Sequence, residues 1–366
     1  MIYPQLVSCH ICPRNCGVNR YTETGFCGAG SEMKINLATL HFGEEPPISG
    51  SKGSGTIFFS HCNLRCVFCQ NYSISSDGWG SESSTLELAK LMLNLQTQQA
   101  HNINLVTPTH YSPQVAAALI MAKDMGLSIP IVWNSSAYES PQTLQRLAGL
   151  VDIYLPDLKY AYGIHAAKYS AAADYPAIAM AAIKEMYAQT GNLISDDNGI
   201  AKRGTIVRLL VMPNGLSGAQ KSLLRLADEI GTEISISLMG QYYPAGKASE
   251  YSELNRGITE QEYQSVVDTA QELGFSDIYV QELSCCDTWT PKFSCDQDNM
   301  GWQNNGVAIG VAIGVGIGVA NSDLPQHPED ASMTAPLSLP MRRLAAQEMA
   351  AQEMAAQENP NMEQYL

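Results

Sequence analysis

Short apolar runs alternate with amphipathic stretches between residues 56 and 284, and this alternation constrains the fold more than any other feature. The apolar runs are brief and several are rich in β-branched side chains, which suits parallel strands that are buried on both faces. They predict strands at residues 56–60, 103–107, 129–133, 151–155, 205–212, 234–238 and 277–281.

The stretches between the predicted strands carry helix start signals. Ser84 with Glu87, and Thr259 with Glu262, have the spacing of a capping box. Apolar residues at helical spacing follow each box, and Gly274 can end the second helix in a left-handed conformation. Two Ser-Pro pairs predict a capping hydroxyl before a proline at the first helical position, and they are Ser112-Pro113 and Ser140-Pro141.

This strand–helix alternation indicates βαβ units with right-handed crossovers. About six repeats in roughly 230 residues predict an α/β fold, built as a partial or complete (β/α) barrel. In such barrels the chemistry lies at the C-terminal ends of the strands. The predicted domains are a Cys-rich N-terminal segment over residues 1–55, the barrel over residues 56–284 and a low-complexity, disordered tail over residues 285–366.

Three cysteines follow the first predicted strand as Cys62-Asn-Leu-Arg-Cys66-Val-Phe-Cys69. Soft thiolates select iron–sulfur clusters, copper(I) or zinc. Three thiolates on a four-iron cluster leave one iron open, and an open metal position lets a substrate bind and react. A zinc site and three unrelated thiols are the alternatives. Structural zinc usually takes four protein ligands, and no fourth cysteine is adjacent.

The C-x3-C-x2-C spacing, after a strand and with an aromatic residue before the last cysteine, resembles the radical S-adenosylmethionine (SAM) superfamily. The resemblance implies a [4Fe-4S] cluster on Cys62, Cys66 and Cys69 whose open iron binds the amino and carboxylate groups of SAM. One electron then cleaves SAM to methionine and a 5′-deoxyadenosyl radical, which abstracts hydrogen from the substrate. It also implies an electron donor such as flavodoxin or ferredoxin.

The resemblance extends over residues 9–283 and is similar to a subgroup that resembles activators of pyruvate formate-lyase. It implies an oxidoreductase that acts on a protein or peptide partner, with a glycyl-radical enzyme as one candidate. A radical SAM enzyme with an unknown small substrate is the alternative. The segments that carry the resemblance include Thr107-Pro-Thr-His110-Tyr, Trp133-Asn134, Leu155-Pro-Asp157-Leu-Lys159-Tyr and Gln241-Tyr-Tyr-Pro.

Each of these segments stands at or just after a predicted strand end, where a barrel site belongs. The resemblance implies that Thr107, Thr109 and His110 contact the methionine part of SAM. Many members carry a Gly-Gly-Glu run there, and this chain does not. For His110, a turn histidine with its hydrogen bonds made within the protein is the alternative. Asn134 ends an apolar strand and either hydrogen-bonds SAM or ties a loop.

Asp157 and Lys159 follow the fourth predicted strand, and the resemblance brings the lysine near the SAM carboxylate. A structural ion pair between them is the alternative. Arg208 lies within the fifth predicted strand, and a cation that points into a barrel must be paired. Its partner is either the SAM carboxylate or Asp157, and we predict catalytic roles for all three residues. Gln241 and Gln281 at late strand ends are weaker candidates.

Four further cysteines form a second ligand set with glycine and proline between its members, and they are Cys9, Cys12, Cys16 and Cys27. Four thiolates can close a structural zinc site or hold an auxiliary iron–sulfur cluster, and the sequence leaves both open. A small segment without a core of its own needs such a cross-link. Disulfides are the remaining alternative. We assign no role to Cys285, Cys286 and Cys295.

The chain of 366 residues is acidic, with a formal net charge of −15, so a phosphate-backbone partner is not favoured and no nucleic acid is expected. The N-terminal residues lack the basic start and apolar run of a secretion signal, and ten cysteines in such a chain predict a reducing, cytoplasmic location. The apolar tract at residues 306–320 would reach only ~22 Å as a helix, against about 30 Å of hydrocarbon. No membrane association is therefore expected.

Two readings from other functional classes remain open. A non-catalytic iron–sulfur protein would need a fourth ligand at the cysteine triplet, and His61 is adjacent to Cys62. A zinc-binding interaction module would hold zinc and no iron.

Overall fold

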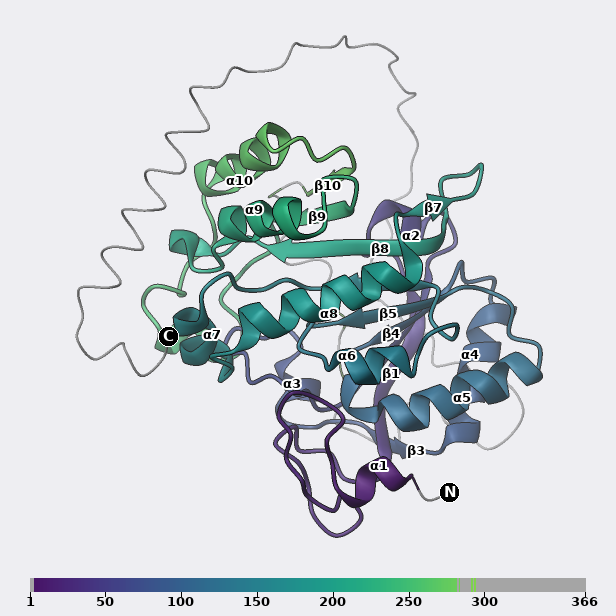
Figure 1. The fold of residues 1–366 in the computed structure, drawn as a ribbon. Coiled ribbons are helices and arrows are strands. Elements are labelled where there is room, and N and C mark those ends of the chain that lie inside the picture. The colour runs from purple at the N-terminus through teal and green to yellow at the C-terminus, as the bar shows by residue number, and fades with distance from the viewer. Residues whose placement is uncertain (1–2, 282, 284–290, 292, 294–366) are drawn as a thin grey trace, which may run out of the picture. The chain divides into compact units, whose positions relative to one another are not determined.

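Seven parallel strands form the centre of the sheet in the computed structural model, which describes residues 3–281, 283, 291 and 293 (Figure 1). These strands are β2 Ser54–Phe59, β4 Ile103–Val106, β5 Ile131–Ser135, β6 Ile153–Pro156, β8 Ala201–Leu210, β9 Ser235–Met239 and β10 Ile278–Val280. They lie in the order β10-β9-β8-β6-β5-β4-β2, with every neighbouring pair parallel. All seven predicted strands are therefore present, with ends that differ from the prediction by a few residues.

Three more strands were not predicted from the sequence. β1 Met33–His41 pairs antiparallel with β2, and β3 Ser81–Ser83 pairs antiparallel with β1. β7 Ile194–Ser195 forms a short antiparallel ribbon with β8. Among the described strands the sheet is open, since β10 and β3 are its two edges, so of the two predicted forms only a partial barrel agrees with the observed pairing.

The longer helices are α4 Thr85–Thr97, α5 Ser112–Asp124, α7 Gly163–Ser170, α8 Tyr175–Thr190, α9 Ala219–Glu229 and α10 Glu260–Glu272, and shorter ones include α1 Pro4–Val7, α2 Pro46–Ser49, α3 Tyr72–Ser75 and α6 Pro141–Gln145. Both predicted capping boxes are confirmed: Ser84 caps α4 and Thr259 caps α10, each with reciprocal bonds to a glutamate. Gly274 follows α10 with φ of +83°.

The two Ser-Pro predictions were only partly right. Ser112 is the first residue of α5 rather than its cap, because the chain already turns into η1 Thr109–Tyr111 just before it. Ser140 does precede α6, but its hydroxyl donates to Gln142 Oε1 and makes no capping bond.

The helices α4, α5, α6 and α8 lie on one side of the sheet in Figure 1. Alternate strand residues such as Ile103, Leu105 and Trp133 pack beneath these helices. The residues between them point to the opposite face, where Val132 and Ile206 pack with Ile48 of α2. The segment that contains α2 thus covers the opposite face near the start of the strands. Among the described residues, no helix combines the length and apolarity needed to cross a membrane.

Candidate active site

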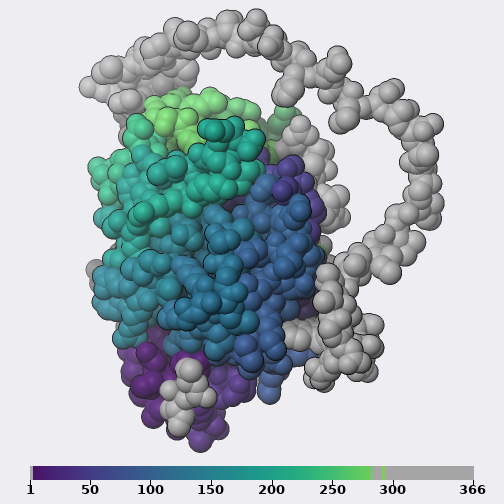
Figure 2. All heavy atoms as spheres, turned by 90° about the vertical axis from the view of Figure 1, so that its right-hand side faces the viewer, coloured from purple at the N-terminus to yellow at the C-terminus, as the bar shows by residue number. Residues whose placement is uncertain are grey.

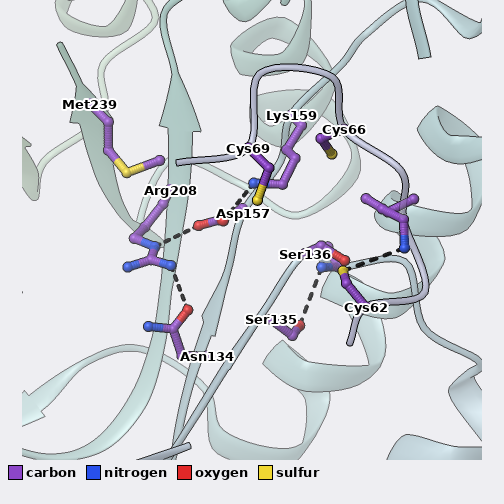
Figure 3. Close-up of polar contacts among 12 residues, drawn as sticks. Cys62, Cys66, Cys69, Asn134, Ser135, Ser136, Asp157, Lys159, Arg208 and Met239 are labelled. Atoms are coloured by element: carbon purple, nitrogen blue, oxygen red, sulfur yellow. Dashed lines mark hydrogen bonds and ion pairs between the residues drawn. The ribbon is translucent and has the colours of Figure 1, made fainter. Parts of the chain in front are cut away.

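A cavity of about 220 Å³ opens at the C-terminal ends of the parallel strands. The three cysteines of the loop after β2 line one part of it, as Figure 3 shows. Residues from four other strand ends line another part, and they are Thr107, Asn134, Asp157 with Lys159, and Arg208. Gln241 and Gln281, which follow β9 and β10, also line it. Parallel strands bring residues that are far apart in sequence to one edge of the sheet.

The cysteine loop leaves β2 and folds back over the strand ends. Cys62, Cys66 and Cys69 are free thiols, and each has a hydrogen-bonding neighbour. The Leu64 amide lies 3.4 Å from Cys62 Sγ, Ser170 Oγ donates to Cys66 Sγ at 2.9 Å, and Ser75 Oγ lies 3.1 Å from Cys69 Sγ.

Burial raises the pKa of all three thiols, and that of Cys66 to about 11. Lys159 opposes this effect at each of the three sulfurs. The charge of Lys159 therefore acts on all three sulfurs. Buried thiols of this kind become thiolates when a metal supplies the missing positive charge.

Lys159 is held by an ion pair within its own loop. Its Nζ donates to Asp157 Oδ2 at 2.7 Å, and both side chains are about five-sixths buried, with 16% of each exposed. Burial lowers the pKa of Lys159, but Asp157 and Cys66 outweigh it, so the pKa lies above its ordinary value. Burial also acts on Asp157, where it raises the pKa. The charges of Arg208 and Lys159 outweigh burial, so the pKa of Asp157 lies below its ordinary value and the carboxylate is ionised.

Arg208 points from β8 into the cavity, and Figure 3 shows its contacts with Asp157 and Asn134. Its Nε donates to Asp157 Oδ1 at 2.6 Å, one terminal nitrogen donates to Asn134 Oδ1 at 2.5 Å, and the other lies 3.0 Å from Glu44 Oε2. Asp157 therefore bridges both cations. The prediction that Arg208 must be paired is confirmed, and Asp157 is one partner.

Sequence reasoning missed Glu44 and Glu45, which line the same cavity from the segment before α2. Glu44 accepts hydrogen bonds from Asn104 at 2.8 Å and from Asn134 at 3.3 Å, besides its pair with Arg208. Burial raises the pKa of both glutamates. Oε2 of Glu45 is buried and has no hydrogen-bond partner among the described residues. The one sequence signal was the pair of adjacent acids in an otherwise apolar and Pro-rich stretch.

Thr107, Thr109 and His110 separate in the structure. Thr107 lines the cavity and has a left-handed backbone with φ of +59°. Thr109 and His110 are buried outside the residues that line the cavity. His110 Nε2 lies 2.9 Å from the Ser60 carbonyl oxygen, and burial lowers its pKa to about 3. This histidine ties the end of β2 to η1, and a contact between either residue and a ligand stays a prediction.

The N-terminal cysteines lie in a segment that packs against the cysteine loop, and Figure 2 shows this N-terminal part at one end of the body. Cys9, Cys12 and Cys27 are buried and Cys16 is half-buried, and all four are free thiols. No three His, Cys, Asp or Glu side chains of the described residues converge, as they stand, on a point where a single metal ion could bind. The four-iron cluster predicted at Cys62, Cys66 and Cys69 would not require such convergence, because each thiolate binds a different iron.

No family profile matches the chain. The chain is 32% identical over 281 residues to "Uncharacterized protein MJ0674" of Methanocaldococcus jannaschii, and the match covers 74% of this chain and 77% of that protein. This chain belongs to the MJ0674 family.

Likenesses to solved structures are weaker. The FeFe-hydrogenase maturase HydG from Carboxydothermus hydrogenoformans gives a TM-score of 0.42 at 12% identity, over 59% of this chain and 50% of HydG. Streptococcus suis SuiB, bound to precursor peptide SuiA, gives a TM-score of 0.42 at 10% identity, over 62% of this chain and 48% of SuiB. Methylornithine synthase (PylB) gives a TM-score of 0.40 at 13% identity, over 67% of this chain and 74% of PylB. This MJ0674-family chain spans about half the length of HydG and SuiB, and scores below 0.5 leave the function to be argued from the site.

Proposed function

We propose that this chain is a radical SAM enzyme, which reductively cleaves S-adenosylmethionine and uses the resulting 5′-deoxyadenosyl radical to abstract hydrogen from a substrate. One observation carries the proposal. Three free thiols and one lysine gather at the rim of a cavity at the C-terminal ends of parallel strands. That is where a (β/α) fold carries its chemistry.

The residues fit a [4Fe-4S] cluster on Cys62, Cys66 and Cys69. Each sulfur has a neighbouring hydrogen-bonding group, and such groups stabilise thiolate charge and tune a cluster. A cluster held by these three cysteines would supply an electron and an open iron position for the amino and carboxylate groups of SAM. The cavity beside the sulfurs leaves room for that ligand.

Lys159 is the residue we assign to the SAM carboxylate. Its charge acts on the cysteines, and Asp157 holds its ammonium at 2.7 Å, so its position is fixed before the ligand arrives. Arg208 acts through Asp157, because its guanidinium is already occupied by Asp157, Asn134 and Glu44. Thr107 and Asn134 line the cavity and offer hydrogen-bonding groups to the rest of SAM.

The position of His61 favours this proposal over a non-catalytic iron–sulfur protein. His61 has φ of +70°, and it is not among the residues that line the cavity. Its ring packs between two glycines: a Cβ at Gly78 would lie 2.5 Å from His61 Cε1, and one at Gly28 would lie 3.0 Å from Nδ1. A histidine held in this way is poorly oriented to become a fourth ligand of a cluster on the three cysteines.

The finer form of the proposal is a protein or peptide substrate, with a glycyl-radical enzyme as one candidate, and flavodoxin or ferredoxin as the reductant. It rests on the resemblance of the strand-end segments to activators of pyruvate formate-lyase. An unknown small substrate remains the alternative, because the cavity is lined by both polar and apolar side chains.

The test is anaerobic reconstitution with iron and sulfide, addition of SAM and dithionite, and measurement of 5′-deoxyadenosine. The Cys66→Ala variant should lose the product, while Lys168→Met, on the exposed side of α7, should keep it. A protein that holds a full cluster and makes no 5′-deoxyadenosine would overturn the proposal.

A further inference from the structure

We propose that Glu45 binds a positively charged amino group of the substrate, in the part of the cavity that lies on the far side of Arg208 from the cysteines. The inference deepens the proposed function, because it names an amine as the class of substrate. It rests on that function only in calling the bound amine a substrate. Binding of an amine at Glu45 requires no SAM cleavage, so the two proposals can be tested separately.

Glu45 is a buried acid with one unpartnered oxygen. It lies just before α2 and lines the cavity, with 8% of the residue exposed. The Ser237 side chain hydrogen-bonds the carboxyl group, but Oε2 is buried and has no hydrogen-bond partner among the described residues. The side chain makes no capping bond to α2 either. A buried acceptor without a donor is costly, so a ligand that supplies a donor would be stabilised here.

The two cations of the cavity are committed to other acceptors. The guanidinium of Arg208 donates to the side chains of three other residues, as described above. The ammonium of Lys159 is held by Asp157 at 2.7 Å. Arg208 acts on Glu45 through its charge, but Oε2 receives no hydrogen bond from either cation. A donor for this oxygen therefore has to come from a ligand.

The charges that line the cavity are unbalanced when all of its acids are ionised. Leaving the three cysteines aside, the described acidic and basic residues that line it are Glu44, Glu45, Asp157, Lys159, Arg208 and His41. Burial lowers the pKa of His41, so this residue adds no positive charge at neutral pH. Burial also raises the pKa of Glu45, which means that Arg208 alone does not offset the cost of its charge. A positively charged ligand would supply the missing charge.

An ammonium group suits this position better than a metal ion. The acids of the described residues do not converge, as they stand, on a point where a metal could bind. Hard cations also require about six or more oxygen ligands, whereas Glu45 offers one unpartnered oxygen. An ammonium group presents N–H donors and carries the positive charge on the same atom. Such charge-assisted hydrogen bonds are the stronger ones.

The wall beside the acidic pair would accept an apolar body. Phe58, Ile74 and Val106 pack together and line the cavity. His41 connects this wall to the acids, because its ring lies edge-on to Phe58 with the centroids 6.2 Å apart, and Glu44 follows it closely in the sequence. Sites of this kind bind the apolar body of a ligand and use a few polar groups to orient it. The geometry therefore points to an amine with a short aliphatic or aromatic body.

The first experiment compares two probes of the same size, n-butylammonium and 1-butanol. Their Kd values are measured by saturation-transfer NMR on the full-length chain, reconstituted anaerobically, with and without SAM. We expect butylammonium to bind about tenfold more tightly than butanol, because only the cation makes a charge-assisted hydrogen bond. Glu45→Gln should weaken butylammonium to the level of butanol. Glu260→Gln, in the exposed first turn of α10, is the matched control and should behave like the parent chain.

A second variant separates charge from position. Glu45→Asp keeps the carboxylate but shortens the side chain by one methylene, so its Kd for butylammonium should lie between those of the parent chain and Glu45→Gln. Circular dichroism and the Tm check the fold of each variant. The comparison of the two probes in the parent chain needs no variant, so the inference stays testable if a variant fails to fold.

Equal affinity for the two probes, or no binding of butylammonium, would overturn the amine assignment. Binding that survives in Glu45→Gln would overturn the role of Glu45. Competition between butylammonium and SAM, together with a weaker Kd for SAM in Glu45→Gln, would place Glu45 in the SAM site and would also overturn the inference. Failure of SAM cleavage in a chain that still binds butylammonium through Glu45 would count against the proposed function alone.

Discussion

Nε of Arg208 donates a 2.6 Å hydrogen bond to Oδ1 of Asp157, across 51 residues of sequence and between the neighbouring strands β8 and β6. The bond explains how two cations share one cavity. Asp157 takes Arg208 on one oxygen and Lys159 on the other, and Glu44 completes the charge balance on the far side of Arg208.

Removing the Arg208 charge should destabilise the fold. Arg208→Met leaves the buried carboxylate of Glu44 without its cation and leaves Asp157 with Lys159 alone. Losing one partner of a buried pair costs about 3–5 kcal/mol. We expect that decrease in the free energy of unfolding, measured by urea denaturation of the reduced, metal-free protein. Arg225→Met, which breaks a partly exposed pair with Glu229 on α9, should cost at most ~1 kcal/mol. Equal effects of the two variants would contradict the account of the cavity.

Lys159→Met should weaken SAM binding without loss of the cluster. The charge of the ammonium acts on all three cysteines, and a charge-assisted hydrogen bond contributes about 1.5–3 kcal/mol, which is roughly a 10- to 150-fold increase in Kd. Equilibrium binding of SAM to the reconstituted protein measures it, with iron content as the control for loading. A variant with full iron and the parent Kd would show that another residue binds the carboxylate.

Ser170→Ala should make the cluster harder to reduce. Hydrogen bonds to cluster sulfurs stabilise the reduced state, and the Ser170 hydroxyl donates to Cys66 Sγ at 2.9 Å. A bond of about 1 kcal/mol corresponds to a midpoint potential lowered by ~40 mV for one electron. A redox titration followed by electron paramagnetic resonance measures the shift, and Ser128→Ala, remote on the surface, is the control. A potential that stays at the parent value would argue against this contact in the loaded protein.

His110 should make the fold acid-sensitive. Burial lowers its pKa from 6.5 to about 3, so the folded protein keeps the imidazole neutral while the unfolded chain takes up a proton below pH 6.5. Stability is therefore lost as the pH falls from 6.5 toward 3, by about 1.4 kcal/mol per pH unit. Urea denaturation gives the free energy of unfolding at pH 7 and at pH 5. The decrease between these two pH values should be smaller by ~2 kcal/mol in His110→Gln than in the parent chain. The more exposed His101→Gln should change the pH dependence less, and a slope unaffected by His110→Gln would refute the assignment.

The parallel part of the sheet was predictable because its strands are short, apolar and separated by amphipathic helices. β1 escaped prediction for a physical reason. It flanks the parallel strands, most of its residues are only half-buried, and Lys34, Asn36 and Thr39 interrupt its apolar positions. Antiparallel pairing with β2 stabilises it instead, and pairing partners in a sheet leave no mark on the local sequence.

The site was predictable where its residues stand in order after strand ends. The cysteine loop, Asn134, Asp157 and Lys159 meet because parallel strands end at the same edge. Glu44 was not predictable, because its partners Asn104, Asn134 and Arg208 are contributed by three different strands. His110 was misleading because its place in the sequence is that of a site residue and its side chain lies elsewhere. It stands after a strand in the expected place, and its ring turns to the Ser60 carbonyl rather than to the cavity.

The contact between Glu44 and Arg208 has a consequence for biosynthesis, because the two residues are 164 positions apart. At about 5–20 residues per second, a ribosome needs roughly 8–33 s between making one and making the other. The cysteine loop is complete early in that interval, long before its lysine and the charges below it exist. The cavity can therefore close only after β8 has left the ribosome. Until then the three cysteines must stay reduced.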